Sequence, residues 1–138
     1  MGLKSIKGIL RNCTINFWTN KKLLGDWGEA YTAAHLRRQG YAIVASQFRC
    51  RMGEIDLIAR KDGVLCFVEV KTRTETEHGL PREFVGPKKQ QRIRAAAAQY
   101  LARYGLDCPV RFDVAEVCTT DALEENKTTI EYLEAAFE

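Results

Sequence analysis

The sequence predicts an α/β domain with a mixed β-sheet and helices packed on its faces. Three observations support this class. Two alternating apolar runs flank Asp62-Gly63, a pattern typical of a tight β-hairpin. Residues 87–104 carry apolar side chains at helical spacing, between Pro87 and Gly105. A strand is expected on each side of this helix, and strand–helix–strand connections give parallel strands with a right-handed crossover.

The N-terminal residues 1–22 are predicted to form a basic arm, followed by a single domain over residues 23–138. The arm contains five Lys or Arg residues and no acidic residue. A helix is expected over residues 23–39, because an apolar stripe recurs at helical spacing and Gly40 supplies a C-terminal stop. The stripe consists of Trp27, Ala30, Tyr31 and Ala34.

The remaining elements complete the order α-β-β-β-α-β. Strands are expected over residues 41–51, over the two arms of a hairpin within residues 54–71, over 110–118 and, as a short edge strand, over 128–133. Residues 72–86 are polar and contain Gly and Pro, which predicts a loop long enough to carry function.

The hairpin carries an unusual arrangement of charge. A two-residue turn places Asp56 opposite Glu69, and Glu54 opposite Lys71. Strand side chains alternate, so all four are expected on one face. Two carboxylates ~5 Å apart at an effective dielectric of about 20 repel by roughly 3 kcal/mol. A good cross-strand pair returns only ~1 kcal/mol. A hard divalent cation such as Mg²⁺ would reverse this repulsion, since it prefers oxygen ligands.

Composition excludes few functions. The chain of 138 residues is 46% hydrophobic and has a net charge of +3, too small to establish a nucleic-acid partner. No apolar run reaches the length of a membrane span, so no membrane association is expected. The five cysteines form no Cys-x-x-Cys pair, which indicates reduced thiols in a cytoplasmic protein.

Basic residues gather where a helix does not favour them. The first turns of the 87–104 helix hold Lys88, Lys89, Arg92 and Arg94. Cations at a helix N-terminus oppose the helix dipole, so stability does not require them there. Binding of a polyanion would require cations at this position. The alternative is that these residues form a charged helix face that only contacts solvent.

Glu29 shares a helix face with Ala33 and Leu36, which is unusual for a carboxylate. One interpretation is a surface glutamate near the N-terminal turn, where the helix dipole favours negative charge. The other is a functional residue that faces the hairpin.

Five segments together are similar to one known family. They are Gly28-Glu29, Arg49-Cys50-Arg51, the segment from Gly53 to Ile58, the segment from Phe67 to Arg73, and Arg111-Phe112-Asp113-Val114. The chain resembles the YraN family from about Leu24 onward. These are small, largely uncharacterised bacterial proteins with a restriction-endonuclease-like fold of the PD-(D/E)XK superfamily. The proline that this superfamily has before its acid is replaced by Ile55.

The resemblance implies a set of site residues. Asp56 and Glu69 would be catalytic metal ligands for Mg²⁺ or Mn²⁺, and Lys71 would be the catalytic lysine. Glu29 matches the helix acid that completes the metal site in related resolvases. Arg73, which ends the motif, joins the basic helix residues as an expected DNA contact.

Three hypotheses follow from these observations. The first is a metal-dependent nuclease that hydrolyses phosphodiester bonds in DNA, including branched or damaged DNA. The second is a non-catalytic nucleic-acid-binding module that keeps the nuclease fold. The third is an ion-pair network on the sheet surface that includes Glu54 and Lys71. A homodimer is compatible with each.

Overall fold

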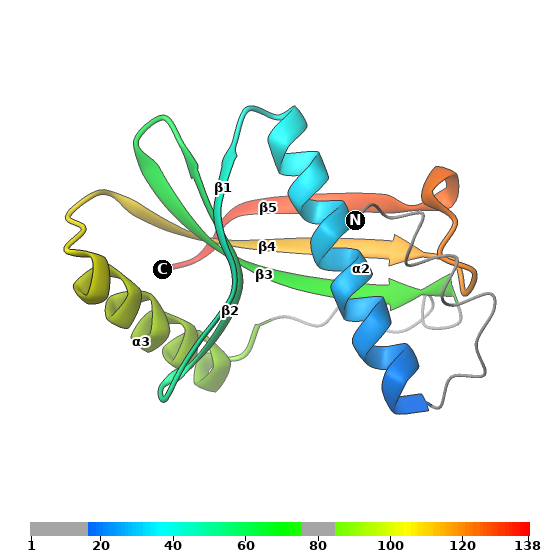
Figure 1. The fold of residues 1–138 in the computed structure, drawn as a ribbon, viewed down its shortest axis with the longest axis horizontal. Helices are drawn as coiled ribbons and strands as arrows, with labels where there is room; N and C mark the ends of the chain where they lie inside the picture. The colour runs from blue at the N-terminus through cyan, green and yellow to red at the C-terminus, as the bar shows by residue number, and fades with distance from the viewer. Residues whose placement is uncertain (1–16, 76–84) are drawn as a thin grey trace.

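The computed structural model describes residues 17–75 and 85–138, and these form a five-stranded sheet with two helices (Figure 1). The elements in chain order are α2 (Phe17–Arg38), β1 (Ala42–Cys50), β2 (Gly53–Lys61), β3 (Val64–Thr74), α3 (Pro87–Tyr104), β4 (Val110–Thr119), a short 3₁₀ helix (Glu125–Lys127) and β5 (Thr129–Phe137).

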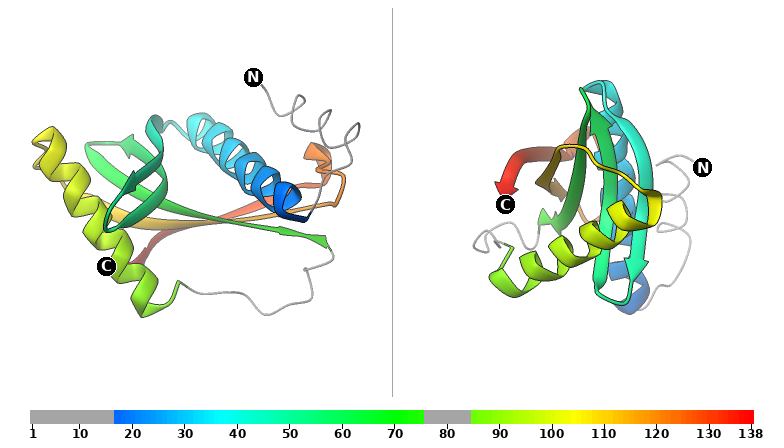
Figure 2. Two further views of the ribbon diagram at one scale, coloured as in Figure 1. Left: turned by 60° about the horizontal axis from the view of Figure 1, so that its bottom comes forward. Right: turned by 90° about the vertical axis from the view of Figure 1, so that its left-hand side faces the viewer.

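The sheet has the order β1-β2-β3-β4-β5. Only β3 and β4 are parallel, and α3 makes the crossover between them. Figure 2 shows α2 on one face of the sheet and α3 on the other. The predicted α/β fold class is therefore confirmed, with a mixed sheet of the restriction-endonuclease-like kind.

The local signals in the sequence produce the expected boundaries. Asp62 and Gly63 have φ values of 52° and 78°, as a two-residue hairpin turn of this hand requires. Lys61 pairs with Val64, so the predicted hairpin register is confirmed. Gly105 takes the left-handed conformation after α3, with φ of 59°.

The first helix departs from its prediction in two ways. It begins at Phe17, inside the predicted basic arm, and an i,i+4 pair between Lys22 and Asp26 at 3.3 Å supports this early part. Lys4, Lys7 and Arg11 of the arm lie outside the described residues. The division into an arm (1–22) and a domain (23–138) stays a prediction.

The buried face of α2 also differs from the predicted stripe. Of that stripe only Trp27 is buried, and the other buried side chains described in this helix are Thr32, Ala33 and Leu36. Gly28 explains the shift, because a Cβ there would meet the Thr72 hydroxyl at 1.8 Å. Helix and strand approach closely at this glycine, which turns its side of α2 toward the sheet.

The period-two alternation breaks near one end of the β1–β2 pair. Ile55 packs in the same core cluster as Ile58, although an even spacing would be needed to share a face. On β1, Gln47 has a positive φ of 50°, a backbone conformation that is unfavourable for residues other than glycine. In the β1–β2 register Ser46 pairs with Leu57 and Phe48 with Ile55, so Gln47 and Asp56 both lie between these two pairs. The irregular conformation of Gln47 and the break in alternation therefore occur at the same level of the two strands.

Candidate functional site

Asp56 and Glu69 come together where β2 and β3 separate. The ladder between these strands ends at the Leu57–Val68 pair, one residue before them. Asp56 Oδ2 accepts a hydrogen bond of 2.8 Å from the Val70 amide. Burial and then the adjacent Glu69 charge raise the pKa of Asp56 well above its usual value, and the Val70 bond opposes this. The two carboxyl groups interact, although the ladder ends one residue before the predicted Asp56–Glu69 pair.

Glu69 is held by a cation from the protein itself. Lys89, at the start of α3, forms an ion pair with Glu69 Oε1. The Glu69 side chain is only 8% exposed and that of Lys89 is 53% exposed. Hydrogen bonding and charge from Glu69 raise the pKa of Lys89, against the opposing effect of its desolvation. Lys89 was predicted as a DNA contact, and its described contact is with this carboxylate.

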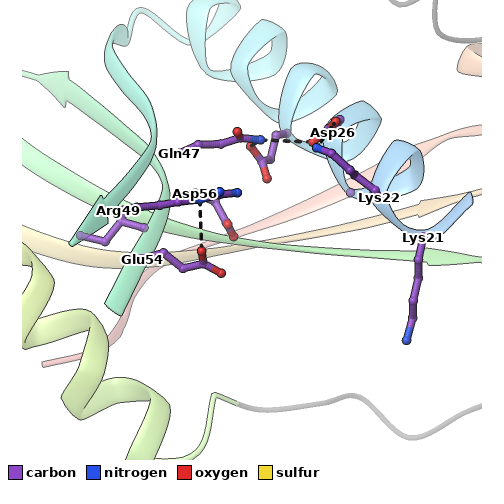
Figure 3. A pocket seen from close by; sticks show the side chains of 10 residues that line it. Lys21, Lys22, Asp26, Gln47, Arg49, Glu54 and Asp56 are labelled. Carbon is purple, nitrogen blue, oxygen red and sulfur yellow. Dashed lines mark hydrogen bonds and ion pairs between the residues drawn. The ribbon is translucent and has the colours of Figure 1, made fainter. Parts of the chain in front are cut away.

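Glu29 approaches the same region from α2. Burial is the main cause that raises its pKa from 4.5 to about 7, and the charges of Asp26, Glu69 and Glu54 add to it. Gln47 Nε2 donates to Glu29 at 3.2 Å and to Asp26 at 3.1 Å (Figure 3). Burial and neighbouring carboxylates determine the pKa of Glu29, so its environment differs from that of an ordinary residue on a helix surface.

A cavity of about 740 Å³ lies beside these residues. Its lining includes four acidic residues, Asp26, Glu29, Glu54 and Asp56, together with Gln47 and three basic residues, Lys21, Lys22 and Arg49; Glu69 is not part of this lining. Figure 3 shows side chains from α2 and from the β1–β2 pair pointing into this space. An open cavity that contains carboxyl groups with raised pKa values is typical of a functional site.

The donor set suits a hard cation. Within residues 17–75 and 85–138, no three His, Cys, Asp or Glu side chains converge as a ready metal cluster. Two carboxylates do converge, and Mg²⁺ commonly takes one or two protein carboxylates and completes its shell with water and phosphate. Burial and then the Glu69 charge raise the pKa of Asp56, and a bound cation would oppose both by favouring the ionised carboxylate. Asp56 and Glu69 therefore fit such an ion, and the Glu29 carboxyl interacts electrostatically with both of them.

Lys71 and Arg73 follow Glu69 along β3. Both line a smaller cavity of about 210 Å³ together with Glu69, Lys89 and Glu116. In the sheet register Lys71 pairs with Glu116 of β4. The predicted catalytic lysine thus lies beside Glu69, two residues along the same strand.

Glu54 does not have the predicted position opposite Lys71. Glu54 of β2 pairs with Arg49 of β1, and the two side chains form an ion pair of 3.4 Å. The reason is that the β2–β3 ladder ends at the Leu57–Val68 pair, and beyond this pair β2 remains paired with β1 and β3 with β4. The proposed surface network between Glu54 and Lys71 is absent from this register.

The basic residues of α3 separate into two groups. Lys88, Lys89 and Arg92 line a cavity of about 790 Å³ that also includes the β1–β2 turn. Arg94 is elsewhere: its Nη1 donates to the backbone oxygen of Glu138 at 2.6 Å. The sequence placed all four in one group, but helical spacing directs Arg94 toward the C-terminus of the chain.

The Arg111-Phe112-Asp113-Val114 segment forms a separate, structural network. Asp113 is fully buried and accepts hydrogen bonds of 2.8 and 2.9 Å from the Arg111 guanidinium. Tyr132 and the Ala135 amide donate to it as well, at 2.6 and 2.9 Å. With both oxygens satisfied, this carboxylate joins β4 to β5 and leaves no position for a ligand.

Sequence reasoning missed Gln47 and Asp26. Asp26 lies one helical turn before Glu29, so its shared face could have been recognised from spacing. For Gln47 no sequence signal exists, because its positive φ and its place between two acids depend on the bend of β1.

The structure also bears on the expectations about membrane spans and cysteines. No helix among the described residues is long and apolar enough to cross a bilayer. The four cysteines within the described ranges, Cys50, Cys66, Cys108 and Cys118, are free thiols.

The fold and the site together define a class: an α/β protein with a carboxylate pair where two central strands of a mixed sheet diverge. The chain belongs to the uncharacterised protein family UPF0102, whose model matches residues 28–117. This confirms the resemblance to YraN-type proteins at the level of the family.

Similar proteins occur in several bacteria. A UPF0102 protein of Chlorobium phaeobacteroides is 46% identical, over 75% of this chain and 82% of its own length. One from Geotalea uraniireducens is 44% identical, over 86% of this chain and 92% of its own. A third, from Syntrophotalea carbinolica, is 50% identical over 68% of this chain and 77% of its own.

Proposed function

We propose that this protein is a metal-dependent nuclease of the PD-(D/E)XK superfamily that hydrolyses phosphodiester bonds in DNA. The observation that carries the proposal is the Asp56–Glu69 pair, two largely buried carboxylates brought together at the divergence of β2 and β3. A purely structural sheet gains nothing from this repulsion.

The chain's residues divide the chemistry among them. Asp56 and Glu69 would hold Mg²⁺ or Mn²⁺, which supplies Lewis-acid polarisation of the phosphodiester and activation of water. The Val70 amide holds Asp56 in position through its 2.8 Å bond. Lys71, beside Glu69, would stabilise the negative charge that develops on the phosphoryl oxygens.

Lys89 has a second part in this scheme. Its ammonium neutralises Glu69 when no other cation is present. A side chain that is half exposed can move, so Lys89 would leave Glu69 to the metal and turn toward a phosphate. Glu29, with its pKa near 7, would take or release a proton close to neutral pH.

A cleavage assay on linear, nicked, flap and four-way DNA, titrated with Mg²⁺ and Mn²⁺, tests the proposal. Asp56→Asn and Glu69→Gln should each abolish cleavage. Glu125→Gln, an exposed carboxylate in the 3₁₀ helix, is the matched control and should keep it. Cleavage by the Glu69→Gln protein at the wild-type rate would exclude this site.

One observation favours the alternative of a non-catalytic nucleic-acid-binding module. The Lys89–Glu69 ion pair gives Glu69 a protein partner, so a metal is not required to stabilise it. Under this alternative DNA binds without cleavage at any divalent concentration, and Lys89 stays paired with Glu69.

A further inference from the structure

A second cavity lies beside the first, with which it shares Arg49 and Glu54, and its lining is more basic. The β1–β2 turn and the first turns of α3 lie side by side (Figure 1), and residues of both line this cavity. The charged residues of its lining are Arg49, Arg51, Glu54, Lys88, Lys89 and Arg92. We call this space the basic groove. Its lining holds five cations against one carboxylate.

The two walls are held together without a side chain between them. A Cβ on Gly53 would lie 3.1 Å from the Arg92 carbonyl oxygen and 3.3 Å from its Cβ. The turn and the helix therefore touch at Gly53, where only glycine fits without displacement. The groove is formed before any ligand arrives, which lowers the entropy lost on binding.

Most of its positive charge is not neutralised by the protein. Arg49 pairs with Glu54, and Lys89 pairs with Glu69. Within the described ranges Arg51, Lys88 and Arg92 are exposed and form no ion pair. Three exposed cations beside a helix N-terminus oppose its dipole, so they favour an anionic ligand over the free state.

The groove is continuous with the candidate site. Arg49 and Glu54 line both cavities, and Lys89 extends from the groove to Glu69. A nucleic-acid strand whose phosphates follow Arg51, Lys88 and Arg92 would therefore reach the carboxylate pair.

Met52 is the unusual member of this wall. It is 55% exposed at the tip of the turn, between Arg51 and Gly53. Met52 is not part of the hydrophobic core, and the sugar-phosphate backbone of DNA provides no apolar surface for it to contact. The faces of the bases are apolar, and methionine is among the side chains that proteins insert between base steps to separate stacked bases.

We infer that the β1–β2 turn is a wedge, and that the basic groove takes duplex DNA whose base stack is interrupted by a nick, flap or branch. Arg51, Lys88 and Arg92 bind the phosphates on either side, and Met52 fills the open step. An interruption lowers the energy needed to separate the bases, so such sites are preferred over intact duplex. The inference rests on the proposed function for its choice of DNA.

Binding without divalent metal separates this inference from catalysis. Fluorescence anisotropy compares a nicked and an intact duplex of one sequence, with 2-aminopurine beside the nick to report unstacking. The wild type should prefer the nicked duplex by about tenfold and brighten the 2-aminopurine. Met52→Ser should lose both effects yet bind intact duplex unchanged, whereas Met52→Leu should keep them.

Val44→Ser is the matched control, because Val44 is another exposed apolar residue, 42% exposed on β1. It should bind as the wild type does. Equal wild-type affinity for the two duplexes, or a preference that survives Met52→Ser, overturns the wedge. Absence of Mg²⁺-dependent cleavage with the preference intact would overturn the nuclease proposal alone. Absence of all DNA binding would overturn both.

Discussion

Lys89 of α3 forms an ion pair with Glu69 of β3, and so joins the basic start of one helix to the acidic centre of the sheet. The pair links the two faces of the proposed site: the carboxylates that would hold a metal and the cations that would hold DNA. Its consequences can be measured without knowing the substrate.

Lys89→Met is expected to destabilise the metal-free protein by about 1–2 kcal/mol, because a nearly buried Glu69 loses its partner beside Asp56. Mg²⁺ should restore much of this loss. Urea denaturation with and without Mg²⁺ measures both effects. Lys88→Met, an exposed neighbour, is the control. Equal stability of the two variants would mean that the ion pair contributes nothing.

Glu69→Gln should change metal-free stability by less than about 1 kcal/mol. Relief of the repulsion from Asp56 favours the variant, while loss of the Lys89 pair opposes it. If the repulsion between Asp56 and Glu69 were the only interaction affected, Glu69→Gln would increase the stability of the protein. Thermal melts in EDTA measure the balance, and a loss of several kcal/mol would identify a structural ion pair as the main role of Glu69.

The stability of the metal-free protein should fall as pH rises from about 4.5 to 7. The pKa of Glu29 is raised from 4.5 to about 7, so in this range the folded state holds a proton that the unfolded chain releases. Unfolding is therefore favoured by rising pH. Glu29→Gln should make the fall less steep, and the raised pKa of Asp56 should maintain the remaining slope, as denaturation midpoints at successive pH values will show. A flat wild-type profile would contradict the burial of this carboxyl.

Gln47→Met should raise the pKa of Glu29 further. The Gln47 amide donates to the Glu29 carboxylate at 3.2 Å and so lowers that pKa, against the effect of burial. An NMR titration of the Glu29 side-chain carboxyl measures the shift. An unchanged titration would mean that water replaces the amide and that Gln47 does not position Glu29.

Charge reversal at Arg51, Lys88 and Arg92 should reduce the salt dependence of DNA binding. Each phosphate that is no longer neutralised by the protein lowers the log–log slope by about 0.9 for duplex DNA. Arg94→Glu carries the same type of change on the same helix, but Arg94 contacts Glu138 outside the groove, so its slope should equal that of the wild type. Equal slopes for all variants would mean that the groove does not bind phosphates.

Asp113→Ala should destabilise the protein by about 3–5 kcal/mol without abolishing a site function, because it leaves Arg111 and Tyr132 without their buried acceptor. Asp121→Asn, an exposed position after β4, should leave stability within about 0.5 kcal/mol of the wild type. Denaturant titration compares them. A small loss for Asp113→Ala would show that its network is replaced by water.

Local chemistry by itself determined much of the fold. Asp62-Gly63 specifies a two-residue turn, and that turn specifies the register that brings Asp56 to Glu69. Pro87 and Gly105 likewise begin and end α3. These residues act through their own backbone preferences, so neighbouring sequence is enough to predict them.

Long-range packing decided the rest. Lys89 meets Glu69 because α3 crosses between parallel strands. Glu54 pairs with Arg49 because the β2–β3 ladder ends at Leu57–Val68 and leaves β2 paired with β1 alone. The positive φ of Gln47 belongs to the same divergence. Each depends on elements distant in the chain, whose relative placement is set by burial of the shared core and has no signature in any short segment.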